Sequence, residues 1–349
     1  MLVPVLLFIV GLFLLIRGGG WFVDGAVGIA RRFRLPELLI GATVVSVGTT
    51  LPEVMVSAAS AVGGHGEIAY GNAVGSIICN TALIAALTIA IRPSRVERKT
   101  LRTPVVFFFA AAAFYALTAY ISGHFSRLDG VLLLLIFSAY MGVTFMQVWK
   151  ESRQERRDGP PAQEAVRPGP GAVPVEAAGR GANPGEAEKA GEGSIRKDIL
   201  RLAAGAVLVA AGAKLLVDNG TLIAQALGVP ESVIALTFVA LGTSLPELTT
   251  AVTSLVKGHG ALSLGNVIGA NLFNLVLVSG LSVTLAPFDI PQNAVIAGHN
   301  ASLVLDIPVM LFAMLFLTVP ALMKERLTRL QGILLLLVYG VFCGIQFML

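Results

Sequence analysis

Two six-residue motifs place a proline and a carboxylate inside long apolar runs of the chain. The first motif, GTTLPE, ends at Glu53, and the second, GTSLPE, ends at Glu247. A proline has no N–H and displaces the carbonyl four residues earlier in a helix, so Pro52 and Pro246 each free the carbonyl of the glycine that begins the motif. Each motif therefore predicts a broken helix in which free carbonyls and a carboxylate lie close together.

Hydroxyl groups accompany the two carboxylates, on Thr49, Thr50, Thr243 and Ser244. Carbonyl, hydroxyl and carboxylate oxygens are the ligands of hard cations. Ca²⁺ takes about six to eight oxygens at about 2.3 to 2.6 Å, whereas Mg²⁺ requires a small octahedron and retains its waters. A flexible cage with two carboxylates therefore suits Ca²⁺ better than Mg²⁺.

A second pair of segments follows the two motifs. GNAVGSIICN ends at Asn80, and GNVIGANLFN ends at Asn274. We expect Ser76, Asn80 and Asn274 to bring side-chain oxygens within reach of the same cage. The segments also carry Asn72 and Asn266, which either line a cavity or form hydrogen bonds between helices.

The composition shows which solvent surrounds these motifs. Of the 349 residues, 55% are hydrophobic and 13% are charged, and the mean hydropathy is +0.81. Runs of about 20 apolar residues, enough to cross a hydrocarbon core of about 30 Å, occur ten times. They lie near residues 2–30, 36–62, 67–91, 103–122, 130–149, 197–227, 231–256, 261–286, 302–320 and 328–348. The chain is therefore predicted to be an all-α polytopic membrane protein with ten transmembrane helices, the first of them retained because no positive residue precedes it.

The distribution of Lys and Arg predicts the orientation. With both termini outside the plasma (inner) membrane, the inside segments contain 22 of the 25 Lys and Arg residues. These inside segments are 31–37, 92–102, 150–201, 257–260 and 321–329. The basic pI of about 9.2 then reflects membrane topology, and no nucleic-acid partner is expected.

The interval 150–195 differs from its surroundings, since it is rich in Pro, Gly, Ala and charge and has no apolar periodicity. We interpret it as a disordered cytoplasmic linker, acting either as a plain tether or as a regulatory segment. It separates a first five-helix unit, 1–149, from a second, 196–349.

The two units repeat each other at a constant offset of 194 residues. The offset relates Gly48 to Gly242, Glu53 to Glu247, and Asn80 to Asn274, and the motif regions span 41–83 and 235–277. Because five helices, an odd number, separate equivalent positions, the second copy must lie inverted in the membrane. Inverted repeats with broken helices are typical of secondary transporters, which bind their substrate near the midplane.

These paired motifs resemble the two alpha repeats of the cation/calcium exchanger superfamily, most closely its prokaryotic sodium/calcium exchanger branch. The resemblance covers nearly the whole chain except the linker. It implies a Ca²⁺/Na⁺ antiporter working by alternating access, in which Glu53 and Glu247 bind Ca²⁺ beside the carbonyls and hydroxyls of Thr49 and Thr243. It also implies sodium sites that draw on Thr50, Ser76, Ser244, the carbonyls near Ser46 and Ala240, Asn80 and Asn274.

Two departures from the family pattern leave the counter-ion open. Ser76 is followed by Ile77 where the family usually has asparagine, and Ala270 replaces the serine of the second copy. The position of Asn274 is an aspartate in some relatives, notably the potassium-dependent ones, and an asparagine in others. Carboxylates can be neutralised by protons as well as by Na⁺, so Ca²⁺/H⁺ exchange is the alternative.

Other classes of function are less consistent with the sequence. A cation channel with a carboxylate-lined pore would not need an inverted repeat with broken helices. The sequence contains no phosphate-binding glycine loop with lysine and no His/Cys metal cluster, so we expect neither an enzyme nor an organic cofactor. The expected partners are Ca²⁺, Na⁺ or H⁺ and the lipid bilayer, and the protein is expected to be a monomer.

Overall fold

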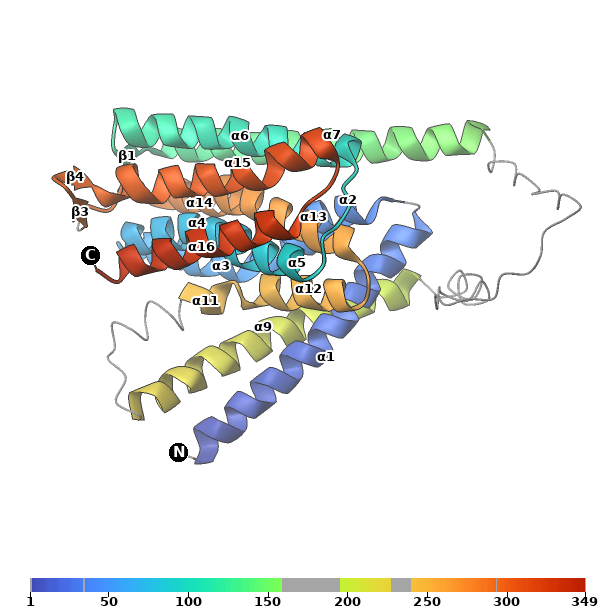
Figure 1. The fold of residues 1–349 in the computed structure, drawn as a ribbon, viewed down its shortest axis with the longest axis horizontal. Coiled ribbons are helices and arrows are strands. Elements are labelled where there is room, and N and C mark those ends of the chain that lie inside the picture. Colours follow the sequence, from blue (N-terminus) through green and yellow to red (C-terminus); the bar gives the residue numbers. More distant parts are fainter. Residues whose placement is uncertain (1, 34, 159–194, 227–239, 293, 349) are drawn as a thin grey trace, which may run out of the picture.

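The computed structural model describes residues 2–33, 35–158, 195–226, 240–292 and 294–348, and these residues are almost entirely helical (Figure 1). The α-helices are α1 (Leu2–Arg32), α2 (Glu37–Ile40), α3 (Ser46–Val62), α4 (Gly66–Cys79), α5 (Ala86–Ile91), α6 (Arg98–Ile121), α7 (Arg127–Asp158), α9 (Ile195–Ala226), α11 (Ala240–Thr243), α12 (Leu245–Val256), α13 (Gly260–Phe273), α14 (Ser279–Leu285), α15 (Ile307–Lys324) and α16 (Arg329–Gln346). The π-helices are η1 (Gly41–Val45), η2 (Asn80–Ala85), η4 (Asn274–Val278) and η5 (Ser302–Asp306).

Eight continuous helical segments among the described residues are long and apolar enough to cross a membrane. They are Leu2–Arg32, Glu37–Val62, Gly66–Ile91, Arg98–Ile121, Arg127–Gln147, Gly260–Leu285, Ser302–Lys324 and Arg329–Gln346. The sixth predicted span corresponds to α9. The seventh falls on α11 and α12 and on residues 227–239, which lie outside the described residues.

The predicted linker overlaps the ends of two helices. Helix α7 continues to Asp158, past the boundary expected at residue 150, and α9 begins at Ile195. The sequence KESRQERR at the end of α7 is rich in Lys, Arg, Glu and Gln. These residues favour helix and can form i,i+4 pairs, so α7 continues beyond the end of the apolar run. Residues 159–194 lie outside the described residues.

The prediction of a broken helix at Pro52 is wrong for the first copy. Helix α3 runs through Pro52 from Ser46 to Val62, and it is continuous with η1 and α2. A proline removes one hydrogen bond but can leave the flanking residues helical where packing holds them, and α3 packs on α4 and α13.

In the second copy the helix is interrupted, as predicted. Helix α11 ends at Thr243, and Ser244 adopts φ −88° and ψ 4° before α12 starts at Leu245. Pro246 thus falls in the first turn of α12, where a missing N–H costs little.

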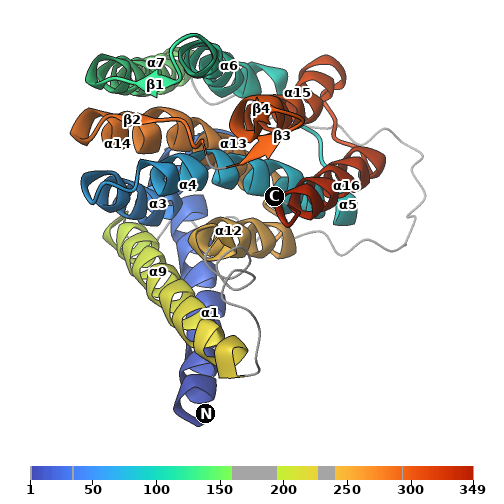
Figure 2. The ribbon, with the colours of Figure 1, turned by 90° about the vertical axis from the view of Figure 1, so that its left-hand side faces the viewer.

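The helices form layers (Figure 2). Helices α6 and α7 lie on one side of the molecule, α1 and α9 on the opposite side, and α3, α4, α12 and α13 between them. The central segments are the most enclosed: 83% of the Gly260–Leu285 window and 72% of the Gly66–Ile91 window are buried, against 22% for Leu2–Arg32. The central segments are also the ones that carry the asparagine motifs, so these polar groups are shielded from lipid by other helices.

Helices α1 and α9 pack closely along their length because glycines line their contact. A Cβ added at Gly18 would lie 2.9 Å from the Val209 nitrogen, and one at Gly212 would lie 2.8 Å from the Leu15 nitrogen. Such small residues let two helix backbones approach within a membrane. The pair covers one side of the central helices, since α1 also contacts α12.

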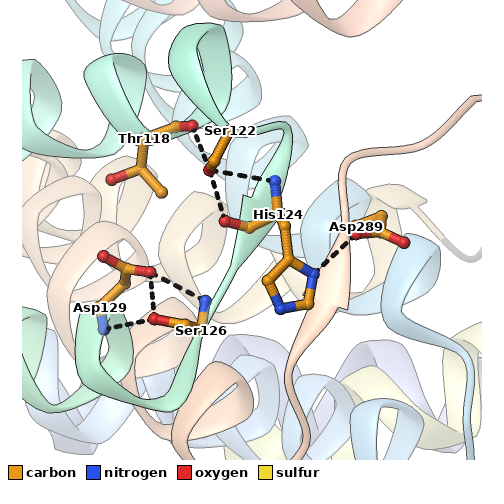
Figure 3. A network of polar contacts seen from close by, with 6 residues as sticks. All are labelled: Thr118, Ser122, His124, Ser126, Asp129 and Asp289. Atoms are coloured by element: carbon orange, nitrogen blue, oxygen red, sulfur yellow. Dashed lines mark hydrogen bonds and ion pairs between the residues drawn. The ribbon is translucent and has the colours of Figure 1, made fainter.

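The connections gather at two ends of the bundle. At one end, β1 (His124–Phe125) pairs antiparallel with β2 (Phe288–Asp289), and His124 Nδ1 lies 2.7 Å from Asp289 Oδ1 (Figure 3). A small hairpin, β3 (Val295–Ile296) with β4 (His299–Asn300), lies in the same connection as β2.

At the other end, the backbone of Arg95 pairs with that of Arg326, and the Val96 N–H donates to the Glu325 carbonyl at 3.0 Å. His259 Nδ1 lies 2.8 Å from Glu37 Oε1 at the same end. We call this second end the basic end, because the described cations of segments 31–33, 92–102, 257–260 and 321–329 belong to it.

Candidate cation site

The two motif glutamates are buried without hydrogen-bond partners. Glu53 on α3 and Glu247 on α12 are 0% exposed, and none of their four carboxylate oxygens has a partner among the described residues. The two carboxylates are close enough to interact electrostatically. A buried carboxylate without hydrogen bonds or a counter-charge is strongly unfavourable, so this arrangement calls for a cation or a proton.

Threonines of the first motif border the carboxylate of the second. The Thr49 and Thr50 side chains lie beside the Glu247 carboxylate. The Thr50 hydroxyl is buried and has no hydrogen-bond partner among the described residues, whereas the Thr49 hydroxyl donates to Asn266 Oδ1 at 3.2 Å. The Thr50 oxygen beside Glu247 therefore remains available to a cation.

The two copies contact each other reciprocally through threonine and asparagine. Thr243 donates its hydroxyl to Asn72 Oδ1 at 3.1 Å, which is the same contact as Thr49 to Asn266 with the two copies exchanged. The offset of 194 residues relates both members of the pair. Asn72 and Asn266, for which the sequence left cavity lining and helix contact open, thus form hydrogen bonds between helices.

The two copies differ in a pair of hydroxyl groups between the helices. The Ser244 hydroxyl lies 3.5 Å from the Ser76 hydroxyl. The equivalent pair in the other copy is Thr50 with Ala270, and Ala270 is buried but has no hydroxyl. The missing hydroxyl agrees with the observation that Thr50 lacks a partner.

Asn80 and Asn274 occupy equivalent and unusual backbone positions. Each is 0% exposed, each begins a π-helix, and neither side-chain amide has a hydrogen-bond partner among the described residues. A π-turn inserted in an α-helix is frequent at functional sites. These four unpaired amide atoms lie in the most enclosed helices, where η4 contacts α3, which carries Glu53, and η2 contacts α12, which carries Glu247.

The resemblance implied carbonyl ligands near Ser46 and Ala240, and the structure describes the surroundings of Ser46 only. The Ser46 carbonyl accepts a contact from the Thr49 hydroxyl at 3.5 Å, and the Ser46 hydroxyl donates to the Gly41 carbonyl at 2.7 Å. Ala240 is the first residue of α11, and its side chain lies outside the described part of the chain.

Sequence reasoning missed Ser57. Asn72 Nδ2 donates to Ser57 Oγ at 2.8 Å and to the Glu53 carbonyl at 3.3 Å. The equivalent of Ser57 in the second copy is Ala251, and Asn266 Nδ2 is buried without a partner. Comparison of the two copies at the offset of 194 residues would have revealed the difference between Ser57 and Ala251.

Sequence reasoning also missed a polar cluster formed by α13, η2 and α15. Asn271 Nδ2 donates to Thr81 Oγ1 at 2.7 Å and contacts Met314 Sδ at 3.1 Å. The first copy has Ile77 at the position of Asn271, so this cluster has no counterpart.

Little open space adjoins the motifs. A cavity of about 10 Å³, lined by Gly48, Thr49, Pro52 and Pro246 together with residues of α1 and α9, has room for about one water. Among the described residues, no three His, Cys, Asp or Glu side chains form a cluster that could hold a metal ion. A cation at this site would therefore be held by two carboxylates and neutral oxygens.

Membrane-length helices that enclose unpaired carboxylates and amides define a membrane protein with a candidate ion site between its helices. Comparison with known proteins identifies the family: the profile described as sodium/calcium exchanger protein matches residues 3–146 and 197–348. The chain belongs to this family, whose members are transporters.

Individual relatives cover almost the whole chain. The inner membrane protein YrbG of Escherichia coli (strain K12) is 34% identical over 90% of this chain and 89% of its own. The sodium/calcium exchanger MaX1 of Methanosarcina acetivorans is 31% identical over 98% of both chains. A structure of the sodium-calcium exchanger NCX_Mj soaked with Na⁺ and Sr²⁺ has a TM-score of 0.75 at 30% identity and covers 97% of each chain.

Proposed function

We propose that this protein exchanges Ca²⁺ for Na⁺ across the membrane by alternating access, and that Glu53 and Glu247 together bind Ca²⁺ at the midplane. The observation that carries the proposal is the set of four buried carboxylate oxygens without partners. Thr50, beside Glu247, and Asn80 and Asn274, on π-helices that contact α12 and α3, add further unpaired oxygens. Ca²⁺ prefers such a set of oxygens, and its charge matches two carboxylates.

Exchange follows from the cost of the empty site. A charged side chain at the bilayer centre costs about 2.5 to 3.5 kcal/mol even on the mildest scale. A carrier with both glutamates ionised and no bound cation is therefore disfavoured in the occluded state that alternating access requires. Ca²⁺ or Na⁺ neutralises the site, so the carrier crosses readily only when it is occupied.

Ten helices in two inverted halves supply the moving parts in this proposal. The reciprocal contacts of Thr49 with Asn266 and of Thr243 with Asn72 support it, because each joins one copy to the other. When one half moves against the other, one of these equivalent contacts can open while the other stays closed.

Calcium uptake into proteoliposomes tests the function. We expect an outward-directed Na⁺ gradient to drive ⁴⁵Ca²⁺ into vesicles, and a pH gradient of equal size to drive little uptake. Liposomes without protein provide the background. Uptake that ignores the Na⁺ gradient would exclude Na⁺ as the counter-ion.

Ca²⁺/H⁺ exchange is a second candidate because of one observation. Ala270 stands where the first copy has the hydroxyl of Ser76, so the chain offers Na⁺ one hydroxyl fewer beside Thr50. Protons neutralise carboxylates without needing a ligand shell. Uptake driven by the pH gradient alone would favour this candidate.

A further inference from the structure

A large cavity lies at the basic end, and neither Glu53 nor Glu247 lines it. It has a volume of about 1030 Å³ and is formed by the start of α2, the α5–α6 connection and the α15–α16 connection. Five cations line it: Arg95, Arg98, Lys99, Lys324 and Arg326. Three carboxylates are also present, on Glu37, Glu97 and Glu325, so positive charge prevails.

The carboxylates neutralise the cavity only in part. Glu37 already contacts His259 at 2.8 Å, and Glu97 accepts from the Thr100 hydroxyl at 3.3 Å. Within the part of the chain that the structure describes, no ion pair joins Arg95, Arg98, Arg326 or the nearby Arg102 to a carboxylate. These four residues are exposed, and their guanidinium groups are available to an anion.

A second cavity extends the first toward the apolar side of α6. It has a volume of about 660 Å³ and shares Arg98, Lys99 and Glu325 with the first, and it then continues along Arg102, Thr103, Val106 and Phe107 of α6 to Val143 of α7. Arg98 and Val106 are eight residues apart, which is about 12 Å along a helix. The lining therefore changes from cationic to apolar within two turns.

The helix start adds further anion-binding groups. Helix α6 begins at Arg98, and its N-cap residue Glu97 provides no side-chain cap. The first-turn amides of a helix favour negative charge, and this turn lines both cavities. This feature supports the cationic lining.

We propose that these joined cavities bind one anionic phospholipid, with its phosphate at Arg95, Arg98 and Arg102 and an acyl chain along Val106, Phe107 and Val143. A free phosphate would use only the cationic part, whereas a phospholipid matches both parts of the lining. Basic pockets between transmembrane helices bind anionic headgroups in this way. Val106 is 56% exposed, so the apolar part is open to the lipid.

Native mass spectrometry of the purified full-length chain tests the proposal. The protein is mixed with phosphatidylglycerol or with phosphatidylcholine of the same acyl chains, and bound lipids are counted. We expect preferential retention of phosphatidylglycerol. Each cation near such a surface contributes about a fivefold change in affinity, so the R95Q/R98Q/R102Q variant should lose about a hundredfold.

Two control variants separate charge loss at this site from other effects. The R196Q/K197Q/R201Q variant removes three exposed cations from α9 and should retain the lipid as the wild type does. The R95K/R98K/R102K variant keeps the charge and should also retain it, which would exclude unfolding as the cause of the loss.

Three outcomes would overturn the proposal. The first is equal retention of both lipids by the wild type, and the second is unchanged retention by the R95Q/R98Q/R102Q variant. The third is displacement of phosphatidylglycerol by an equal concentration of inorganic phosphate, since the acyl chain would then contribute nothing.

Discussion

The regions around Glu53 and Glu247 are built from the same motif, but the asparagine side chain beside each has a different set of hydrogen-bond partners. Around Glu53, the neighbouring amide of Asn72 is paired with Ser57, and the helix is continuous through Pro52. Around Glu247, Asn266 Nδ2 has no partner among the described residues, and the helix is interrupted at Ser244.

This difference indicates which properties the two copies share and which they do not. Both copies keep the carboxylate, the threonine that contacts asparagine, and the asparagine that begins a π-helix. They differ in the hydroxyls of Ser57 and Ser76, which are replaced by Ala251 and Ala270. We infer that Ca²⁺ binding depends on both copies equally, whereas Na⁺ binding and rigidity differ between them.

The largest expected effect concerns the shared feature. Glu53→Gln and Glu247→Gln should each abolish calcium flux in proteoliposomes, because each removes one of the two charges that offset the dehydration of Ca²⁺. Size-exclusion chromatography of each variant provides the control for folding. Near-normal flux in either folded variant would contradict the shared site.

Ala270→Ser should have a smaller effect, and only on Na⁺. The new hydroxyl restores the partner of Thr50 that Ser76 provides for Ser244, so apparent Na⁺ affinity should rise several-fold with little change for Ca²⁺. The measurement is the Na⁺ dependence of calcium efflux in wild type and variant. An unchanged Na⁺ curve, or an equal shift in the Ca²⁺ curve, would mean that Ala270 does not mark a missing ligand.

Stability should change in opposite directions at Ser57 and Ala251. Ser57→Ala removes the shorter of the two hydrogen bonds of the Asn72 amide and leaves it only the Glu53 carbonyl, so it should destabilise the protein by about 0.5 to 1.5 kcal/mol. Ala251→Ser offers a partner to the unpaired Asn266 amide and should raise the Tm measured in detergent. If both substitutions lower the Tm equally, the described difference between the copies has no energetic consequence.

The smallest expected effect is that of potassium. Asn274 is neutral where potassium-dependent relatives have a carboxylate, so replacing K⁺ by choline should leave calcium flux unchanged. Flux that requires K⁺ would show that another group takes the place of that carboxylate.

Which polar residues are buried between the helices was in part predictable from the sequence, because this depends on local pattern. The repeated motifs identified Glu53, Glu247, Asn80 and Asn274, and the structure buries all four. The continuity of α3 through Pro52 was not predictable, because packing against neighbouring helices decides whether a proline interrupts a helix or leaves it intact.

Contacts between distant residues were also beyond the sequence. Ser57 and Asn72 lie 15 residues apart on different helices, and Asn271 and Thr81 lie 190 residues apart. Their pairing depends on helix rotation and on the register of the two halves, which no local motif specifies. The cationic cavity likewise combines three connections that the sequence keeps far apart.

Equilibrium binding of ⁴⁵Ca²⁺ to the purified protein tests the central claim most directly. We predict that the wild type binds one Ca²⁺ per chain at this site, that Na⁺ displaces it, and that Glu53→Gln and Glu247→Gln each remove the binding. Retention of Na⁺-sensitive Ca²⁺ binding at wild-type affinity in both variants would contradict the claim that the two buried carboxylates form the Ca²⁺ site.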